Sequence, residues 1–359
     1  MSVPRIAVDA MGGDDGVRTM VAGVALAVER GLACGLLLVG DRPRIAAEVA
    51  RHPRLQTAQA QGLLDILHAD EVISGEEKPS QALRRARVTS MGLAVDAVKS
   101  GKAGAALSGG NTGALMAIAK LALRTMPGID RPALAALMPT LADSDLVMLD
   151  LGANTECDAR NLVQFAIMGA AYSRIVIDSA APRVRLLNIG TEDIKGTEQL
   201  RDAAAVLRGA TDLPLRFDGF TEADKLCRGE VDVVVTDGFS GNVALKAMEG
   251  TARFVGDLLR RSFASSLRSK LGFLISKPAT ELLKHHLDPN NHNGAVFLGL
   301  NGVVVKSHGS ANAKGVANAI GVTARLLQEN ITQRIAADLE QLGAENLRMA
   351  HKVTLEAHQ

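Results

Sequence analysis

The sequence predicts an α/β protein built on a mainly parallel sheet with helices on both faces. The repeating unit is a short apolar run, then a cluster of Gly, Ser, Asn, Thr or Asp, then a helical stretch. The apolar runs lie at residues 6–9, 36–39, 105–107, 146–149, 184–187 and 231–235. Continuous apolar strands that alternate with helices are typical of a sheet that is covered on both sides.

The last predicted strands form a hairpin. Residues 296–300 and 303–306 are apolar runs that flank Asn301 and Gly302, a pair that favours a two-residue turn. A loop rich in serine and glycine follows, and a long helix is expected from Lys314. We therefore expect one α/β domain over residues 1–330, with a helical hairpin inserted at residues 248–290. A helical tail is expected at residues 331–359.

Composition and charge exclude several classes of protein. The 359 residues carry a net charge of +1, and their aromatic residues are Tyr172 and 8 Phe, with no Trp. This composition offers neither a strong positive field nor stacking platforms for nucleic acid. Cys34, Cys157 and Cys227 show no metal-binding spacing, so a reducing cytoplasm is expected. The N-terminus lacks a signal-peptide pattern, and no run is long enough to suggest a membrane span.

Glycine and small polar residues follow nearly every predicted strand. In such sheets the carboxyl ends of the strands line the ligand crevice, and helix N-termini there offer free N–H groups and partial positive charge. We therefore expect these loops to meet at one edge of the sheet, where they would suit a phosphate group. Helix capping and tight turns are the alternative for any single loop. Neither the Walker nor the dinucleotide-binding glycine pattern is present.

Seven motifs, in the same order along the chain, resemble the PlsX family of phosphate acyltransferases. They are AVDAMGGD at residues 7–14, SGGNTGAL at 108–115, DLGAN at 150–154, LVQFAIMG at 162–169, NIGTEDIKG at 188–196, TDGFSGNV at 236–243 and NGVVVKSHGS at 301–310. The resemblance covers residues 3–325. It implies a three-layer α/β/α fold shared with phosphotransacetylases and isocitrate-dehydrogenase-like proteins.

The resemblance also implies a reaction. A long-chain fatty acyl group would move reversibly from acyl carrier protein to inorganic phosphate, giving acyl phosphate for phospholipid synthesis. The implied partners are acyl carrier protein, phosphate, a second copy of the chain as a homodimer, and a membrane glycerol-3-phosphate acyltransferase. No nucleic acid, cofactor or metal is expected. The implied location is the cytoplasm, in peripheral contact with the inner face of the cell membrane.

The candidate site residues lie in these motifs. Phosphate is itself the nucleophile, so the enzyme must bind it, align it and stabilise the oxyanion. We expect His308, Lys306 and Asn242 to act in catalysis, with Lys306 and His308 supplying positive charge or a proton for the leaving thiolate. The expected substrate-binding residues are Asp9, Gly12, Gly13, Asp14, Ser108, Gly109, Gly110, Asn111, Thr112, Asn154, Lys195, Asp237, Ser240, Gly241, Asn301 and Ser310. A capping or core role is the alternative for His308.

A basic amphipathic segment lies in the predicted hairpin. Apolar residues repeat every four positions from Val255 to Leu271, and the run ends in LGFLI at residues 271–275. The candidates for contact with the carrier protein or a membrane are Arg253, Arg260, Arg261, Arg268, Lys270, Leu271, Phe273 and Leu274. Burial in a dimer interface, docking on a membrane surface and recognition of an acidic carrier protein all remain open.

Two further functions compete with the carrier-dependent reaction. A phosphotransacetylase that uses acyl-CoA would need the same phosphate loops. A non-enzymatic scaffold would bind phosphate or an acyl ligand and recruit lipid-synthesis partners at the membrane. The basic amphipathic segment favours the carrier-dependent enzyme and the scaffold over the acyl-CoA enzyme.

Overall fold

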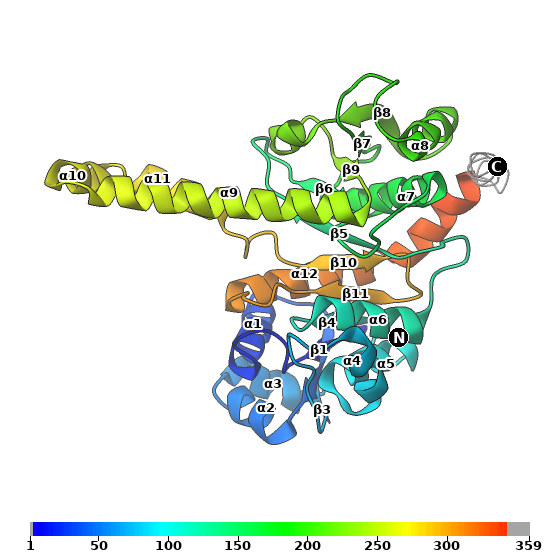
Figure 1. Cartoon of the computed structure of the whole chain (residues 1–359). Helices are drawn as coiled ribbons and strands as arrows, with labels where there is room; N and C mark the ends of the chain where they lie inside the picture. The colour runs from blue at the N-terminus through cyan, green and yellow to red at the C-terminus, as the bar shows by residue number, and fades with distance from the viewer. Residues whose placement is uncertain (1–2, 343–359) are drawn as a thin grey trace.

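A mixed sheet of eleven strands runs through residues 3–342, which are the residues that the computed structural model describes (Figure 1). The strands lie in the order β3-β2-β1-β4-β11-β10-β5-β6-β9-β7-β8. Within these residues, seven neighbouring pairs are parallel, and the three central pairs β11–β10, β10–β5 and β5–β6 are antiparallel. The predicted α/β class and mainly parallel sheet are therefore confirmed.

The predicted strands are present, with small shifts in their ends. The strand bounds are β1 Arg5–Asp9, β2 Gly35–Gly40, β3 Leu64–His68, β4 Ala105–Ser108, β5 Ala133–Met138, β6 Leu146–Leu149, β7 Arg183–Leu187, β8 Arg216–Thr221, β9 Val233–Val235, β10 Ala295–Leu298 and β11 Val303–Lys306. The sequence pattern does not predict β3, β5 and β8. β3 and β8 are the edge strands of the sheet and contain polar residues, and β5 is rich in alanine.

Alternate residues of the strands pack into two separate apolar cores, one on each face of the sheet. In β1, Ile6 and Val8 belong to one core and Ala7 to the other. The first core is covered by α1 Val17–Glu29, α2 Arg42–Val49, α3 Pro53–Ala60, α7 Ala159–Val176, α8 Glu198–Gly209 and α12 Ala313–Gln328. The second is covered by α4 Pro79–Arg85, α5 Ser90–Lys99, α6 Thr112–Leu123 and the base of α9 Gly238–Ala264. The fold therefore has three layers.

The direction of the strands reverses in the middle of the sheet. Because β6 is antiparallel to β5, the strands β6, β9, β7 and β8 run opposite to β1–β4 and β11. The glycine-rich loops therefore do not share one edge, and that expectation is wrong. Val305 of β11 pairs with Val296, and Val296 pairs with Ala135. The β5–β6 register, extended by one residue, places Leu149 beside Ala135, so the carboxyl ends of β11 and β6 meet near the middle of the sheet.

The core continues past residue 330. Residues 331–342 are helical, and Ile331, Ile335 and Leu339 are buried in the first apolar core. Asp338 forms an ion pair with Arg174 of α7. This stretch belongs to the α/β domain rather than to a separate tail, because its apolar residues at helical spacing face the core. The rest of the predicted tail, residues 343–359, lies outside the described residues.

An arm projects from the body of the molecule (Figure 1). It comprises the second half of α9 with α10 Leu267–Ile275 and α11 Lys277–Leu287, and none of residues 256–287 is buried. The four-residue repeat predicts one helix through Leu271, but α9 ends at Ala264. Ser266 caps α10 instead, accepting the Ser269 N–H at 3.0 Å, because serine side chains favour helix starts over helix interiors. The rings of Phe263 and Phe273 hold α10 against α9, with centroids 5.3 Å apart.

The start of α9 is held by the buried loop that follows β6. The Asp150 carboxylate in this loop accepts the N–H groups of Leu134 at 3.0 Å and Asn154 at 2.7 Å, and burial raises its pKa. The Asp150 carbonyl oxygen lies where a side chain at Gly241 would begin, only 1.9 Å from an ideal Cβ. Glycine at this position therefore lets α9 lie directly on the loop.

Gly241→Ala is expected to lower the free energy of unfolding by more than about 3 kcal/mol, because the new methyl group overlaps backbone that cannot move alone. Gly250→Ala, on the same helix, is the matched control, since nothing lies within 4 Å of its Cβ position. Alanine there should raise the stability by about 0.5–1 kcal/mol through helix propensity. Urea unfolding of both variants tests the pair. Equal stabilities would contradict the close approach at Gly241.

Candidate active site

Three loops at the carboxyl ends of β1, β4 and β11 are joined by backbone contacts. The Asp14 N–H donates to Gly309 O at 2.8 Å, which ties the β1 loop to the β11 loop. A Cβ at Gly12 would lie 2.8 Å from Gly110 N, so glycine is what allows the β1 and β4 loops to approach each other. Residues 11–14 and 109–113 form one wall of a cleft together with Lys306, His308 and Gly309. The structure thus brings together most of the residues predicted in these three motifs.

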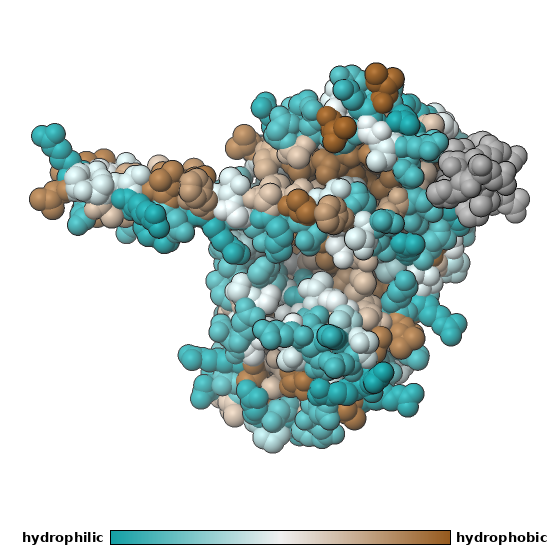
Figure 2. All heavy atoms as spheres, in the orientation of Figure 1, coloured by the Kyte–Doolittle hydropathy of each residue, from teal (hydrophilic) through white to brown (hydrophobic). Residues whose placement is uncertain are grey.

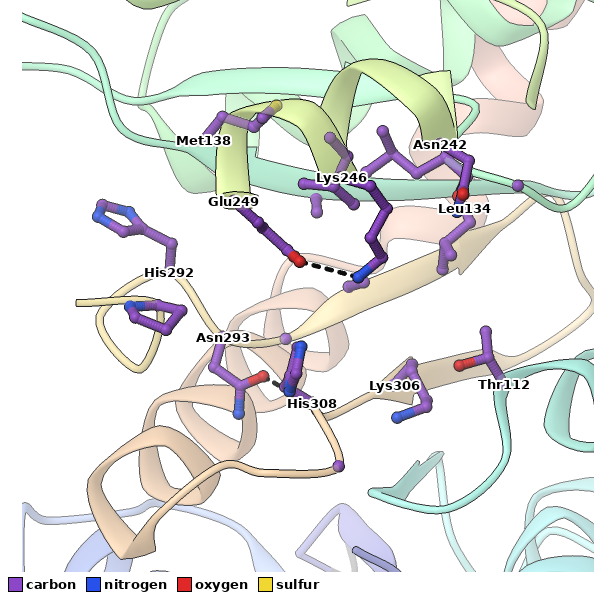
Figure 3. Close-up of a pocket in the computed structure, with 18 of the residues that line it drawn as sticks. Thr112, Leu134, Met138, Asn242, Lys246, Glu249, His292, Asn293, Lys306 and His308 are labelled. Atoms are coloured by element: carbon purple, nitrogen blue, oxygen red, sulfur yellow. Dashed lines mark hydrogen bonds and ion pairs between the residues drawn. The ribbon is translucent and has the colours of Figure 1, made fainter. Parts of the chain in front are cut away.

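The cleft is large and has two chemically different sides. Its volume is about 1660 Å³. The glycine loops and Lys306 form the polar side, and α9 faces them across the opening (Figure 3). The apolar part of the lining comprises Leu134, Ala136 and Met138 of β5, Phe297 of β10, and Leu245, Met248 and Val255 of α9. Residues 151–153 from the loop after β6 also reach it, so both halves of the sheet contribute.

Lys306 is the cationic group of the polar side. It is the last residue of β11 and is buried, and its Nζ donates to Gly109 O at 3.2 Å and to Ser307 O. Burial lowers the pKa of Lys306 to about 8, against the opposite pull of Asp14 and Asp9. The ammonium form therefore predominates at neutral pH, and its charge is weakly screened because water is largely excluded.

His308 lies at the mouth of the cleft and has a defined tautomer. Its Nδ1 accepts the Ser310 N–H at 3.3 Å and lies 3.0 Å from Ser310 Oγ, so the ring proton of the neutral form is on Nε2. Partial burial lowers the pKa of His308; the charge of Glu249 opposes this shift, and the charges of Lys306 and Lys246 add to it. His308 is thus neutral at pH 7 and can donate a hydrogen bond through Nε2. Positive charge on this wall comes from Lys306.

Three side-chain hydrogen bonds hold the loops around the cleft in place. Ser108 Oγ donates to the Asp9 carboxylate at 2.7 Å and accepts the Gly110 N–H at 3.1 Å. Burial raises the pKa of Asp9. Asn242, on the first turn of α9, lines the cleft and donates to Leu151 O at 3.1 Å. Asp9 and Ser108 therefore position the glycine loops, and Asn242 joins α9 to the loop after β6.

Two predicted substrate-binding residues lie away from the cleft. Asn301 is in the hairpin turn, at the amino end of β11 and so opposite Lys306, where its Nδ2 donates to Leu123 O at 3.2 Å and Thr125 O at 2.8 Å. Lys195 is exposed in the loop after β7 and does not line the cleft. Asn301 lies away from the cleft because a hairpin turn precedes β11, whereas Lys195 does so because it follows a strand of the reversed half of the sheet.

Several other predicted residues hold the loops in place. Asn111 lines the cleft, but its Oδ1 caps α6 by accepting the Ala114 N–H at 2.9 Å. Asp237 caps α9, accepting the Ser240 N–H at 2.8 Å. Asn154 donates to Pro132 O at 2.8 Å. Helix capping, the alternative reading of these loops, therefore accounts for the side chains of Asn111 and Asp237. Gly12, Gly13, Asp14, Gly109, Gly110 and Thr112 line the cleft, whereas Asp9, Ser108, Ser240, Gly241 and Ser310 do not.

Sequence patterns do not indicate three residues that the structure places at the cleft. Lys246 and Glu249 look like an ordinary i,i+3 pair on an exposed helix, yet both face the cleft (Figure 3). Asn293 is buried beside the cleft; its Oδ1 accepts the His308 N–H at 2.8 Å and its Nδ2 donates to Ser307 Oγ at 2.8 Å. Among residues 3–342, no group of three or more His, Cys, Asp or Glu side chains is placed to hold a metal ion.

A family model described as "Fatty acid synthesis protein" matches residues 4–334 of the chain. The chain belongs to this family. A "Phosphate acyltransferase" from Erythrobacter litoralis is 69% identical over 343 residues, covering 96% of this chain and 95% of the relative. One from Parvibaculum lavamentivorans is 51% identical over 346 residues, covering 96% and 94%. The predicted resemblance is confirmed, and this member of the family is an acyltransferase.

Solved structures share the fold of this acyltransferase. A phosphotransacetylase from Streptococcus pyogenes superposes with a TM-score of 0.56 at 19% identity, covering 91% of this chain and 94% of the other. The EutD phosphotransacetylase from Staphylococcus aureus gives 0.55 at 16% identity, covering 90% and 94%. The expected phosphotransacetylase-like three-layer fold is therefore confirmed. At these identities the comparison concerns the fold alone.

The pKa of Lys306 predicts a pH dependence for the acyltransferase. Because the amine loses its proton above about pH 8, kcat/KM should fall with increasing pH, approaching about tenfold per pH unit. Lys306→Arg keeps its charge throughout this range, so its profile should lack the alkaline fall even if its activity is lower. Initial rates of both proteins from pH 6.5 to about 9.5 test the expectation. An identical alkaline fall in the arginine variant would assign it to another group.

Proposed function

We propose that this acyltransferase moves a long-chain fatty acyl group from acyl carrier protein to inorganic phosphate. The observation that carries the proposal is the cleft itself, in which glycine loops and the Lys306 ammonium lie on one side and apolar side chains of α9, β5 and β10 line much of the other. The names of the relatives, phosphate acyltransferases, support phosphate as the acceptor. The family description supports a fatty acyl donor.

The polar wall suits a phosphate dianion. Lys306 supplies a partly dehydrated positive charge, and the glycine loops bring the backbone N–H groups of Gly13, Gly109 and Asn111 to the same wall. The N–H groups of Gly12, Asp14 and Gly110 are bonded within the loops. Backbone N–H groups and an ammonium hold an anion without any rearrangement when it binds. Phosphate would thus be aligned for attack on a carbonyl in the cleft.

The apolar wall suits the acyl chain. Leu245, Met248 and Val255 recur along one face of α9 at helical spacing and line the cleft together with Met138 and Phe297. A chain lying along this face has its thioester end at the polar wall. The cleft volume exceeds the roughly 300–1,000 Å³ of an ordinary small-molecule site, which favours a long ligand.

The chemistry needs no covalent intermediate with the enzyme. A phosphate oxygen attacks the thioester carbonyl carbon, the C–O bond forms, and the carbonyl oxygen becomes an oxyanion. The C–S bond then breaks as the carbonyl re-forms, and the proton of the hydrogenphosphate ends on the thiol of the carrier. His308, neutral with its proton on Nε2, donates a hydrogen bond to the oxyanion or the departing sulfur. A thiol with a pKa near 8.5 leaves without a strong acid.

A donor comparison tests this function. Acyl phosphate formed by the purified protein is trapped with hydroxylamine, using palmitoyl-acyl carrier protein, palmitoyl-CoA or acetyl-CoA with inorganic phosphate. We expect product from the carrier-bound long chain and a far lower rate with acetyl-CoA, whose short chain leaves the apolar wall uncovered. Higher activity with acetyl-CoA would favour the competing phosphotransacetylase, which the fold alone does not exclude.

The arm supports a contact outside the cleft. Leu267, Leu271, Leu274 and Ile275 at its tip expose between 61% and 84% of their surface, and Arg268 and Lys270 lie among them. Figure 2 shows hydrophobic residues alternating with hydrophilic ones along the arm. Among residues 3–342, no helix is both long and apolar enough to cross a bilayer. We propose that the tip rests on a lipid surface, as basic amphipathic helices do.

The remaining basic positions, Arg253, Arg260 and Arg261, are exposed on the part of α9 that leads from the cleft to the tip. They are the proposed contacts for the acidic carrier protein, which must deliver its thioester to the cleft. The homodimer and the membrane acyltransferase partner stay predictions. Sedimentation velocity of the full chain tests the first, and co-purification from membranes tests the second.

Leu271→Glu combined with Leu274→Glu should abolish lipid binding at the arm tip, because two carboxylates replace apolar contacts beside the headgroups. The measurement is co-sedimentation with liposomes that contain anionic lipid. Ile189→Glu is the matched control, since Ile189 is 81% exposed in the loop after β7 and lies outside the arm. Unchanged binding by the double variant would remove the lipid contact from the proposal.

A further inference from the structure

α9 carries an ion pair into the cleft, on the wall that faces Lys306. Lys246 and Glu249 follow Asn242 by four and seven residues, so all three share one face of the helix. Figure 3 shows this face turned toward Lys306 and His308, and all five residues line the cleft. Lys246 Nζ donates to Glu249 Oε2 at 2.8 Å.

The Lys246 side chain of this pair is more exposed to solvent than the Glu249 side chain. The Lys246 side chain is 57% exposed, whereas Glu249 is 24% exposed. Water screens an exposed i,i+3 pair, so its contribution to stability is small. A lysine side chain has four rotatable bonds, and its ammonium can therefore leave Glu249 at little cost when a stronger anion arrives.

Lys306, by contrast, is fixed on the opposite wall. Its Nζ donates to the backbone oxygens of Gly109 and Ser307, and the side chain is buried. The charge of Lys246 is close enough to contribute to the lowered pKa of Lys306, after burial. Two ammonium groups that repel each other across a cleft are both stabilised by a dianion placed between them.

We propose that Lys246 is a second phosphate-binding residue, which Glu249 holds in the free enzyme and which turns to the phosphate when the anion binds. This inference deepens the proposed function and rests on phosphate being the acceptor. The anion would then be held from both walls, by Lys306 and the glycine loops on one side and by Lys246 on the other. Leu245 and Met248 on the neighbouring turns of α9 line the same cleft, so the acyl wall and Lys246 belong to one helix.

The alternative is that the pair only stabilises α9. The two interpretations predict different changes in the KM for phosphate when Glu249 is replaced. If Glu249 only holds Lys246 in the free enzyme, replacing Glu249 frees the Lys246 ammonium and removes a carboxylate that repels the phosphate. If the pair is structural, losing either partner has the same small effect. Variants at the two positions therefore separate the readings without depending on the size of a single effect.

The experiment measures the KM for inorganic phosphate of the full chain at a fixed concentration of long-chain acyl carrier protein. Lys246→Met should raise this KM by about 10- to 100-fold, the range for a lost charge-assisted hydrogen bond, and leave the KM for the acyl donor unchanged. Glu249→Gln should lower the KM for phosphate or leave it unchanged. The double variant should behave like Lys246→Met. Lys246→Arg, which keeps the charge, should recover part of the loss.

Lys284→Met is the matched control, because Lys284 forms the same i,i+3 pair with Glu281 at 3.1 Å on α11, outside the cleft. It should leave the KM for phosphate within about twofold of the starting value, as exposed ion pairs contribute little. A KM within twofold for Lys246→Met, or an equal rise in Lys246→Met and Glu249→Gln, would overturn the inference. Failure of the unmodified protein to make acyl phosphate would instead remove the proposed function. Calorimetric titration with inorganic phosphate alone still tests Lys246 in that case.

Discussion

The antiparallel pairing of β5 with β6 turns half of the sheet around, so that two sets of parallel strands point their carboxyl ends toward a shared middle. In a sheet with one strand direction, the ligand loops would lie along a single edge. Here the loops after β1, β4 and β11 meet the loop after β6 across the central strands. The cleft therefore spans the central strands, and apolar residues of β5 and β10 form part of its lining.

α9 makes use of this arrangement. It starts on the loop after β6, at Asp150, and crosses the central strands to face Lys306 before it leaves the body as the arm. One straight helix thus carries the close contact at Gly241, the polar groups of Asn242 and Lys246, and the apolar side chains of Leu245 and Met248. Its second half is exposed and carries the basic residues of the arm. A shift of α9 relative to the loop after β6 would move all of these groups together, because they belong to one helix.

Much of the fold follows from local sequence. Apolar runs with glycine-rich ends predict β1, β2, β4, β6, β7 and β9, because buried parallel strands need apolar side chains on both faces. Asn301-Gly302 predicts the hairpin of β10 and β11. The pattern does not predict the edge strands β3 and β8, because edge strands need not be apolar on both faces. The break at Ser266 shows that a capping serine outweighs a continuous apolar repeat.

By itself the sequence determined the α/β class, the family and the motif that contains Lys306 and His308, since each strand pattern and each motif is formed by residues close together in the chain. The tertiary structure alone decided which loops share the cleft. Asn301 and Lys195 carry suitable chemistry but lie elsewhere, whereas Lys246, Glu249 and Asn293 give no local signal and lie at the cleft. The reason is physical: strand direction and stagger are set by pairing between distant segments, and a pattern within one segment does not record them.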